Sequence, residues 1–174
     1  MSTALERLRS LLDAEGGLIA TLVRGEVPEH ERTPATLAAE GPRAAGRRDE
    51  YELLIEAIYE GYLLHYGAPR VVDVPEDDLR LLAGDRLYAI GLDRLVAIGD
   101  THAVSELADT ITLSALAHGS GAPQLAAAVW AAGARAVGWG ASSAHRTAKE
   151  LLLAGSPAAF EAMRTSAGQA PAAP

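Results

Sequence analysis

Four aspartates have the side-chain chemistry of a divalent-cation site. Asp77 and Asp78 follow Glu76 near the start of a predicted helix, whereas Asp85 and Asp109 occur further along the chain. Carboxylate oxygens are the ligands that Mg²⁺ prefers, and a bound ion of this kind supports chemistry at a diphosphate group. Acids at a helix start are also expected from the helix dipole alone. Capping is therefore the preferred interpretation of the helix-start acids, and a metal-dependent enzyme is the third alternative considered.

Histidines offer a second route to metal or acid–base chemistry. They fall on different predicted segments, and no two have the i, i+4 spacing of a helical metal site; they are His30, His65, His102, His118 and His145. No nucleophile-elbow pattern accompanies them, although a Ser–His–acid site assembled in space stays open. The glycine-rich stretch at 133–140 follows a predicted helix rather than a strand, which argues against a phosphate-binding loop. The sequence predicts no catalytic residue and no metal ligand.

Asp85 is the acid whose position most needs an explanation. On the helical wheel it falls with Leu81, Leu92 and Val96 in an apolar stripe, where a carboxylate is costly unless it is paired or hydrogen-bonded. Gly84, just before it, costs about 1 kcal/mol in a helix interior relative to alanine. The two residues together predict a close helix crossing at Gly84 and a structural hydrogen bond to Asp85. A ligand contact at Asp85 is the alternative.

The elements that must position these residues are helices. Apolar residues make up 49% of the chain but include only one Phe and two Trp, so the content is mainly Ala and Leu, which favours helix. Periodicity, caps and stops predict helices at about 4–14, 49–66, 75–98, 101–118, 123–137, 143–154 and 157–167. The one short candidate strand is Val71-Val72. We therefore expect an all-α helical bundle.

The chain divides into three predicted segments. Residues 1–48 form an N-terminal helix and arm, 49–167 form the helical core domain, and 168–174 form a disordered tail. In the helix that begins near Asp49, a stripe of Glu52, Glu56 and Glu60 lies opposite the apolar residues. The helix at 75–98 is apolar all round, which is typical of the middle of a bundle.

Charge and composition limit the partners and the compartment. The formal net charge of −8 leaves no basic surplus for a nucleic-acid backbone, so we expect no nucleic-acid partner. The absence of cysteine excludes disulfides and fits a reducing compartment. The start of the chain lacks the apolar run of a signal peptide, and the longest uncharged apolar stretch, 125–134, is too short to span a bilayer. We expect a cytoplasmic protein without a membrane span.

One block of the sequence carries a family resemblance. The run from Leu81 to Asp85, which contains Leu82, Ala83 and Gly84, resembles the Leu-Ala-Gly-Asp helix of trans-isoprenyl (polyprenyl) diphosphate synthases. The stretch that ends in Leu64-His65 is similar to the helix that precedes the first Asp-rich motif of that family. Where catalytic members have Asp-Asp-x-x-Asp, this chain has Tyr66, Gly67 and Arg70 with no carboxylate. Gln124 stands where the family has its phosphate-binding lysine.

The resemblance implies a fold, a role and a partner. The expected fold is a truncated isoprenoid synthase bundle, and the closest likeness is to the non-catalytic short component of two-component synthases for quinone side chains (heptaprenyl diphosphate synthase component I or the hexaprenyl diphosphate synthase small subunit). Such a chain would carry no cofactor itself, with Mg²⁺ on a catalytic polyprenyl diphosphate synthase subunit. It would contribute to the partner interface or product tunnel through Leu81, Tyr88, Leu92 and Leu95. The alternative is a non-catalytic homodimer, a relic of the same fold.

Overall fold

The expected helical class is confirmed by a computed structural model, which describes residues 2–29 and 31–168. Within these ranges the helices are α1 (Ala4–Glu15), α2 (Gly17–Thr21), α3 (Pro34–Glu40), the 3₁₀ helix η1 (Pro42–Ala44), α4 (Arg48–Tyr66), α5 (Asp77–Ala97), α6 (Thr101–Gly119), α7 (Pro123–Trp139), α8 (Ser143–Leu153) and α9 (Ala159–Gly168). The expected strand at Val71-Val72 is instead a single antiparallel bridge between Val23 and Val72. The sequence predicts a disordered tail at 168–174. Gly168 instead ends α9, and 169–174 lie outside the described residues.

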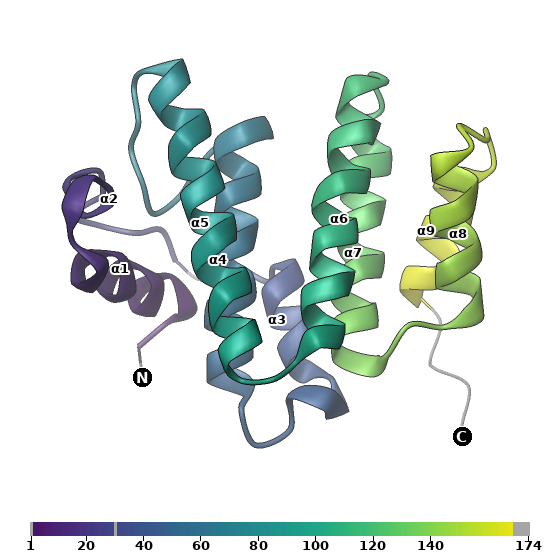
Figure 1. The fold of residues 1–174 in the computed structure, drawn as a ribbon, viewed down its shortest axis with the longest axis horizontal. Coiled ribbons are helices and arrows are strands. Elements are labelled where there is room, and N and C mark those ends of the chain that lie inside the picture. Colours follow the sequence, from purple (N-terminus) through teal and green to yellow (C-terminus); the bar gives the residue numbers. More distant parts are fainter. Residues whose placement is uncertain (1, 30, 169–174) are drawn as a thin grey trace.

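Two helical hairpins form the body of the molecule. Helices α4 and α5 make one hairpin and α6 and α7 make the other, and the two stand side by side (Figure 1). Helix α3 packs against both α4 and α7, while α1 and α2 lie at one end and α8 and α9 at the other (Figure 1). None of the described helices combines the length and the apolar content needed to cross a bilayer.

The N-terminal region belongs to the packed body. Leu8 and Leu12 of α1 are fully buried in one cluster with Leu87 of α5. Ala35 and Ala38 of α3 lie in the central cluster, which also holds side chains from the two hairpins. A third cluster joins α6 and α7 to α8 and α9. The arm expected at 1–48 therefore contributes two of the helices around which the core is built.

Side-chain caps set several helix starts, as the sequence predicts. Thr3 begins α1 with a capping box, in which the Glu6 amide donates to Thr3 Oγ1 and the Thr3 amide donates to the Glu6 carboxylate. Ser142 caps α8. Asp100 caps α6 through the Ala103 amide and also accepts a 2.5 Å hydrogen bond from the Tyr51 hydroxyl, which ties the start of α6 to the start of α4.

Glycines set the close approach of α4 and α5. A Cβ atom added at Gly84 would lie 2.6 Å from His65 Nε2 and 3.1 Å from the Gly61 carbonyl oxygen, so the helix crossing predicted at Gly84 is confirmed. One added at Gly91 would meet the Ile58 side chain and would lie 2.8 Å from the Leu54 carbonyl oxygen. Since backbone cannot move aside cheaply, Gly91 is the tighter of the two contacts.

We predict that Gly91→Ala destabilises the chain by about 1–3 kcal/mol, because the added methyl forces α5 away from α4. Gly119→Ala is the matched control, since Gly119 is also helical but has no neighbour near its Cβ position. There the substitution is expected to be neutral or to stabilise by up to about 1 kcal/mol. Chemical denaturation followed by circular dichroism measures both, and equal effects at the two sites would contradict the tight crossing.

Candidate functional site

The buried polar centre of the molecule lies on α4, at Glu56 and Glu60. Both side chains are fully buried. One oxygen of Glu60 accepts backbone N–H bonds from Arg70 at 2.5 Å and Val71 at 2.6 Å, and the other lies 3.2 Å from Arg70 Nε. Glu56 accepts a 2.7 Å hydrogen bond from Thr33 Oγ1 and a second bond from Arg70 Nη2. The Arg70 guanidinium therefore lies between two carboxylates and also above the ring of Tyr59, 5.3 Å from its centroid.

The sequence identifies the glutamates of α4 as a stripe but does not show whether the stripe is covered. In the structure Glu56 and Glu60 are both shielded from water. The reason is that the loop after α4 folds back over the helix and supplies a guanidinium and backbone N–H donors. Buried charges persist when they are paired and hydrogen-bonded in this way. The signal in the sequence was Arg70 next to two valines, which marks a basic residue beside a buried segment.

We predict that Arg70→Ala destabilises the chain by about 3–5 kcal/mol, because it leaves two buried carboxylates without their cation. Arg70→Lys should recover only part of this loss, since an ammonium lacks the planar fork that reaches both acids. Arg24→Ala is the control: its ion pair with Asp73 is exposed and its Nε donates one hydrogen bond to the Val72 carbonyl, which together should matter by about 1 kcal/mol. Equal unfolding midpoints for Arg70→Ala and Arg24→Ala would show that the pairing is not structural.

An aromatic cluster fills the carboxyl end of α4. Tyr62 and Tyr66 lie one turn apart, and the Tyr66 ring stacks on His118 of α6 with centroids 4.3 Å apart and planes 3° apart. The Tyr62 hydroxyl is 2.9 Å from His118 Nε2, and its ring packs against Trp130 of α7. Tyr66 is 42% exposed. The first degenerate-motif residue thus contributes a partly exposed aromatic ring that joins the two hairpins, while Gly67 ends α4.

Asp85 does not occupy the apolar environment that its wheel position predicts. Its side chain is 68% exposed, because this side of α5 faces solvent. The nearest basic group is His65, whose Nε2 lies 3.1 Å from Asp85 Oδ1 but outside hydrogen-bond geometry. The His65 ring stacks on Tyr88 with centroids 5.3 Å apart. Asp85 is thus at ion-pair distance from His65 of α4, and the predicted structural hydrogen bond is not formed.

The other residues of the resembling block divide between core and surface. Ala83 is buried, whereas Leu82 and Leu81 are 65% and 48% exposed. Tyr88 and Leu92 are half-buried, and burial raises the pKa of the Tyr88 hydroxyl. Leu95 is fully buried in the central cluster, so it cannot contribute directly to an interface or tunnel as expected. We give the name α5–α6 face to five apolar residues that are exposed or half-buried. They are Leu81, Tyr88 and Leu92 of α5 with Val104 and Ile111 of α6.

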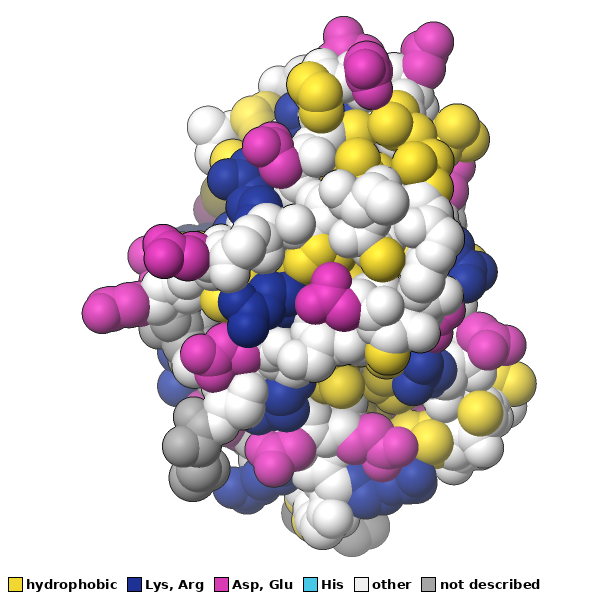
Figure 2. Space-filling model, turned by 90° about the vertical axis from the view of Figure 1, so that its left-hand side faces the viewer, with side chains coloured by type: hydrophobic (Ala, Val, Ile, Leu, Met, Phe, Trp, Pro, Cys, Tyr) yellow, Lys and Arg dark blue, Asp and Glu magenta, His cyan; other side chains and the backbone are white. Residues whose placement is uncertain are grey.

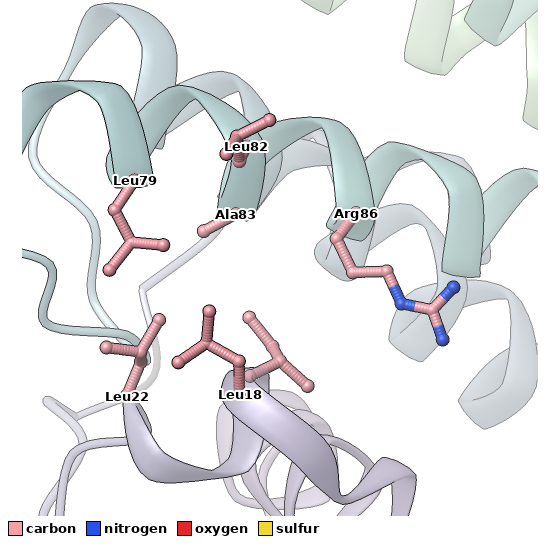
Figure 3. Close-up of a pocket in the computed structure, with 7 residues that line it drawn as sticks. Leu18, Leu22, Leu79, Leu82, Ala83 and Arg86 are labelled. Atoms are coloured by element: carbon pink, nitrogen blue, oxygen red, sulfur yellow. The ribbon is translucent and has the colours of Figure 1, made fainter.

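A small apolar pocket opens on the other side of α5. It has a volume of about 120 Å³ and lies between α2 and the first half of α5 (Figure 3). Leu79, Leu18 and Leu22 point toward one another across it, and Leu82 and Arg86 of α5 also line it (Figure 3). The face seen in Figure 2 carries apolar side chains gathered in its upper part, with basic and acidic groups around them. The pocket is large enough for a single aliphatic group.

A second polar cluster joins α8 to α6. Glu106 is 6% exposed and lies 3.0 Å from His145 Nε2 and 3.1 Å from Lys149 Nζ, which also contacts Asp109 at 2.7 Å. Burial alone would raise the pKa of Glu106, but the hydrogen bonds from His145 and Lys149 and the charge of Lys149 outweigh it and lower that pKa to about 2. Bonds to Asp109 and Glu106 likewise raise the pKa of Lys149 despite its burial. Lys149 is therefore a protonated ion-pair partner, not a free amine nucleophile.

We predict that the stabilising effect of Glu106 disappears in acid. Its pKa is 4.5 in a model compound and about 2 in the folded chain. The unfolded chain therefore binds the extra proton first, so the contribution is complete above pH 4.5 and is lost as the pH falls toward 2. Thermal unfolding should show that the unaltered chain has a higher Tm than Glu106→Gln, and that this difference in Tm decreases as the pH falls through this range. A difference in Tm that stays constant with pH would contradict the lowered pKa of Glu106.

The four aspartates considered as metal ligands are not brought together. Among the described residues no three His, Asp or Glu side chains converge as a metal site needs, and His30 lies outside those residues. Asp109 pairs with Lys149, while Asp77 and Asp78 lie in the first turn of α5, as the capping interpretation expects, although the N-cap residue Glu76 makes no side-chain cap bond. Gly133 packs against Thr110, so close helix packing accounts for a glycine at this position.

No family model, curated protein or solved structure matches the chain in the three comparisons made. The contacts and exposed surfaces of the chain are therefore the basis for proposing a function.

Proposed function

We propose that the chain is a non-catalytic subunit of a heteromeric polyprenyl diphosphate synthase, and that it influences product length. The observation that carries the proposal is the orientation of Arg70. Arg70 stands at the last position of the motif where catalytic synthases have an aspartate, and here its guanidinium is held inside the protein by Glu56 and Glu60. A residue that closes the core at this position cannot also help to hold a Mg²⁺-bound diphosphate.

Prenyl transfer needs the charge of the diphosphate leaving group to be neutralised, which Mg²⁺ held on carboxylates achieves. In the proposed complex the partner supplies those carboxylates and the bound ion. This chain supplies apolar surface, because its own buried acids on α4, Glu56 and Glu60, are paired with Arg70. The division of labour is that the partner performs the ionisation and condensation, and this chain forms part of the wall that limits the product.

The α5–α6 face is the surface that we assign to the partner. Leu81 is 48% exposed, and Tyr88, Leu92, Val104 and Ile111 are half-buried. The partly exposed ring of Tyr66 lies at the end of α4, at the same end of the hairpin as Leu81, and stacks on His118 of α6. Partly exposed aromatic and aliphatic side chains are the kind of groups that form the centre of protein interfaces. A second polypeptide on this face would remove them from water.

Co-expression with a catalytic polyprenyl diphosphate synthase subunit tests the proposal. We expect a complex on gel filtration and a change in the length of the prenyl product relative to the catalytic subunit alone. Leu81→Asp should weaken the complex at least tenfold, whereas Leu153→Asp, at a 65% exposed leucine of α8, should leave it unchanged. No complex and no change in product length would overturn the proposal.

A further inference from the structure

The outward edge of α5 carries a second apolar stripe that the proposed function does not use. Leu82, Ala89 and Val96 repeat every seven residues, which places them on one line along the helix. All three are exposed, Leu82 by 65% and Val96 by 55%. The line is about 21 Å long at 1.5 Å per residue. A ligand that filled the nearby 120 Å³ pocket would leave most of the stripe in water. A second helix is the occupant that matches the length of the stripe.

The stripe is symmetric about its middle residue. If a second α5 lies antiparallel to the first with a two-fold axis near Ala89, Leu82 of each copy faces Val96 of the other. In such an arrangement the same patch serves both subunits. Ala89 is the small residue at the crossing point, which allows the two helix axes to approach closely. The pattern therefore fits a second copy of this chain without a change of register.

Two of the charges beside the stripe, Arg86 and Asp93, have the same symmetry, whereas Asp85 on the opposite flank has no counterpart. Arg86 lies three residues before Ala89 and Asp93 four residues after it, on one flank of the stripe. The antiparallel pairing places Arg86 of each copy opposite Asp93 of the other, and flanking pairs of this kind set the orientation of paired helices. Within the described residues Asp93 has no ion pair, whereas Glu15 has two, with Arg86 at 3.0 Å and Arg94 at 2.8 Å. Arg94 can keep Glu15 neutralised while Arg86 reaches Asp93.

We propose that two copies of this chain associate through the outward edge of α5, antiparallel about Ala89. The edge is short and partly charged, so the dimer belongs to the weak class of interfaces and should dissociate on dilution. The proposal does not depend on a synthase partner, which would occupy the adjacent α5–α6 face. A monomeric chain that still binds a catalytic synthase would overturn the dimer and leave the proposed function standing.

Cysteine cross-linking tests the position of the axis, because the chain has no cysteine of its own. Ala89→Cys places the two thiols next to each other across the axis, and oxidised glutathione accepts the two electrons released as they join. We expect a covalent dimer to form at least tenfold faster than for Leu153→Cys, which is also an exposed position, on α8. Equal rates for the two variants would overturn the arrangement.

Charge exchange tests the pairing itself. Sedimentation of the unaltered chain should show a monomer–dimer equilibrium between low micromolar and near-millimolar concentrations. Asp93→Arg should weaken dimerisation at least tenfold, because it sets two arginines opposite each other, and the double variant Arg86→Asp with Asp93→Arg should restore it. Circular dichroism confirms that each variant folds. A chain that is monomeric throughout, or a dimer insensitive to Asp93→Arg, would overturn the proposal.

Discussion

The buried pairing of Glu56 and Glu60 with Arg70 is the interaction on which the arrangement of this protein depends. Two carboxylates on one helix are stable in the core only because the loop after α4 returns to supply a guanidinium and backbone donors. Glu56 also holds Thr33, the residue that begins α3. The same loop reaches the Val23–Val72 bridge and so fixes the N-terminal region. One polar cluster thereby determines where three separate segments meet α4.

That structural role constrains what the end of α4 can do. A residue whose charge is used to close the core is not free to take part in metal or diphosphate chemistry, and Tyr62 and Tyr66 of α4 pack against Trp130 and His118. In the proposed function, surfaces of the chain act instead of a catalytic centre. Helix α5 has apolar residues on several sides, and its glycines fix it tightly against α4. In the proposed assembly, α5 with its two partly uncovered faces would position other polypeptides.

Much of this fold could be predicted from the sequence, because caps and periodicity act locally. Thr3, Asp100 and Ser142 mark helix starts by chemistry that needs no tertiary context, and Gly84 indicated a close crossing. Periodicity identifies a stripe but not whether it is covered. Asp85 shares a stripe with leucines and yet faces solvent, while Glu56 lies opposite the main apolar face and is buried. Both outcomes depend on segments distant in sequence, as does the Glu106 cluster between α6 and α8.

Arg70 pairs with Glu56 and Glu60 inside the protein, and we propose that it does so where a catalytic synthase would bind metal, so that the chain performs no prenyl transfer by itself. The most direct measurement is an assay of the purified chain with Mg²⁺, isopentenyl diphosphate and farnesyl diphosphate as the allylic substrate. The account predicts unchanged farnesyl diphosphate and no longer prenyl product after prolonged incubation. Magnesium-dependent formation of an elongated product by the chain alone would contradict it.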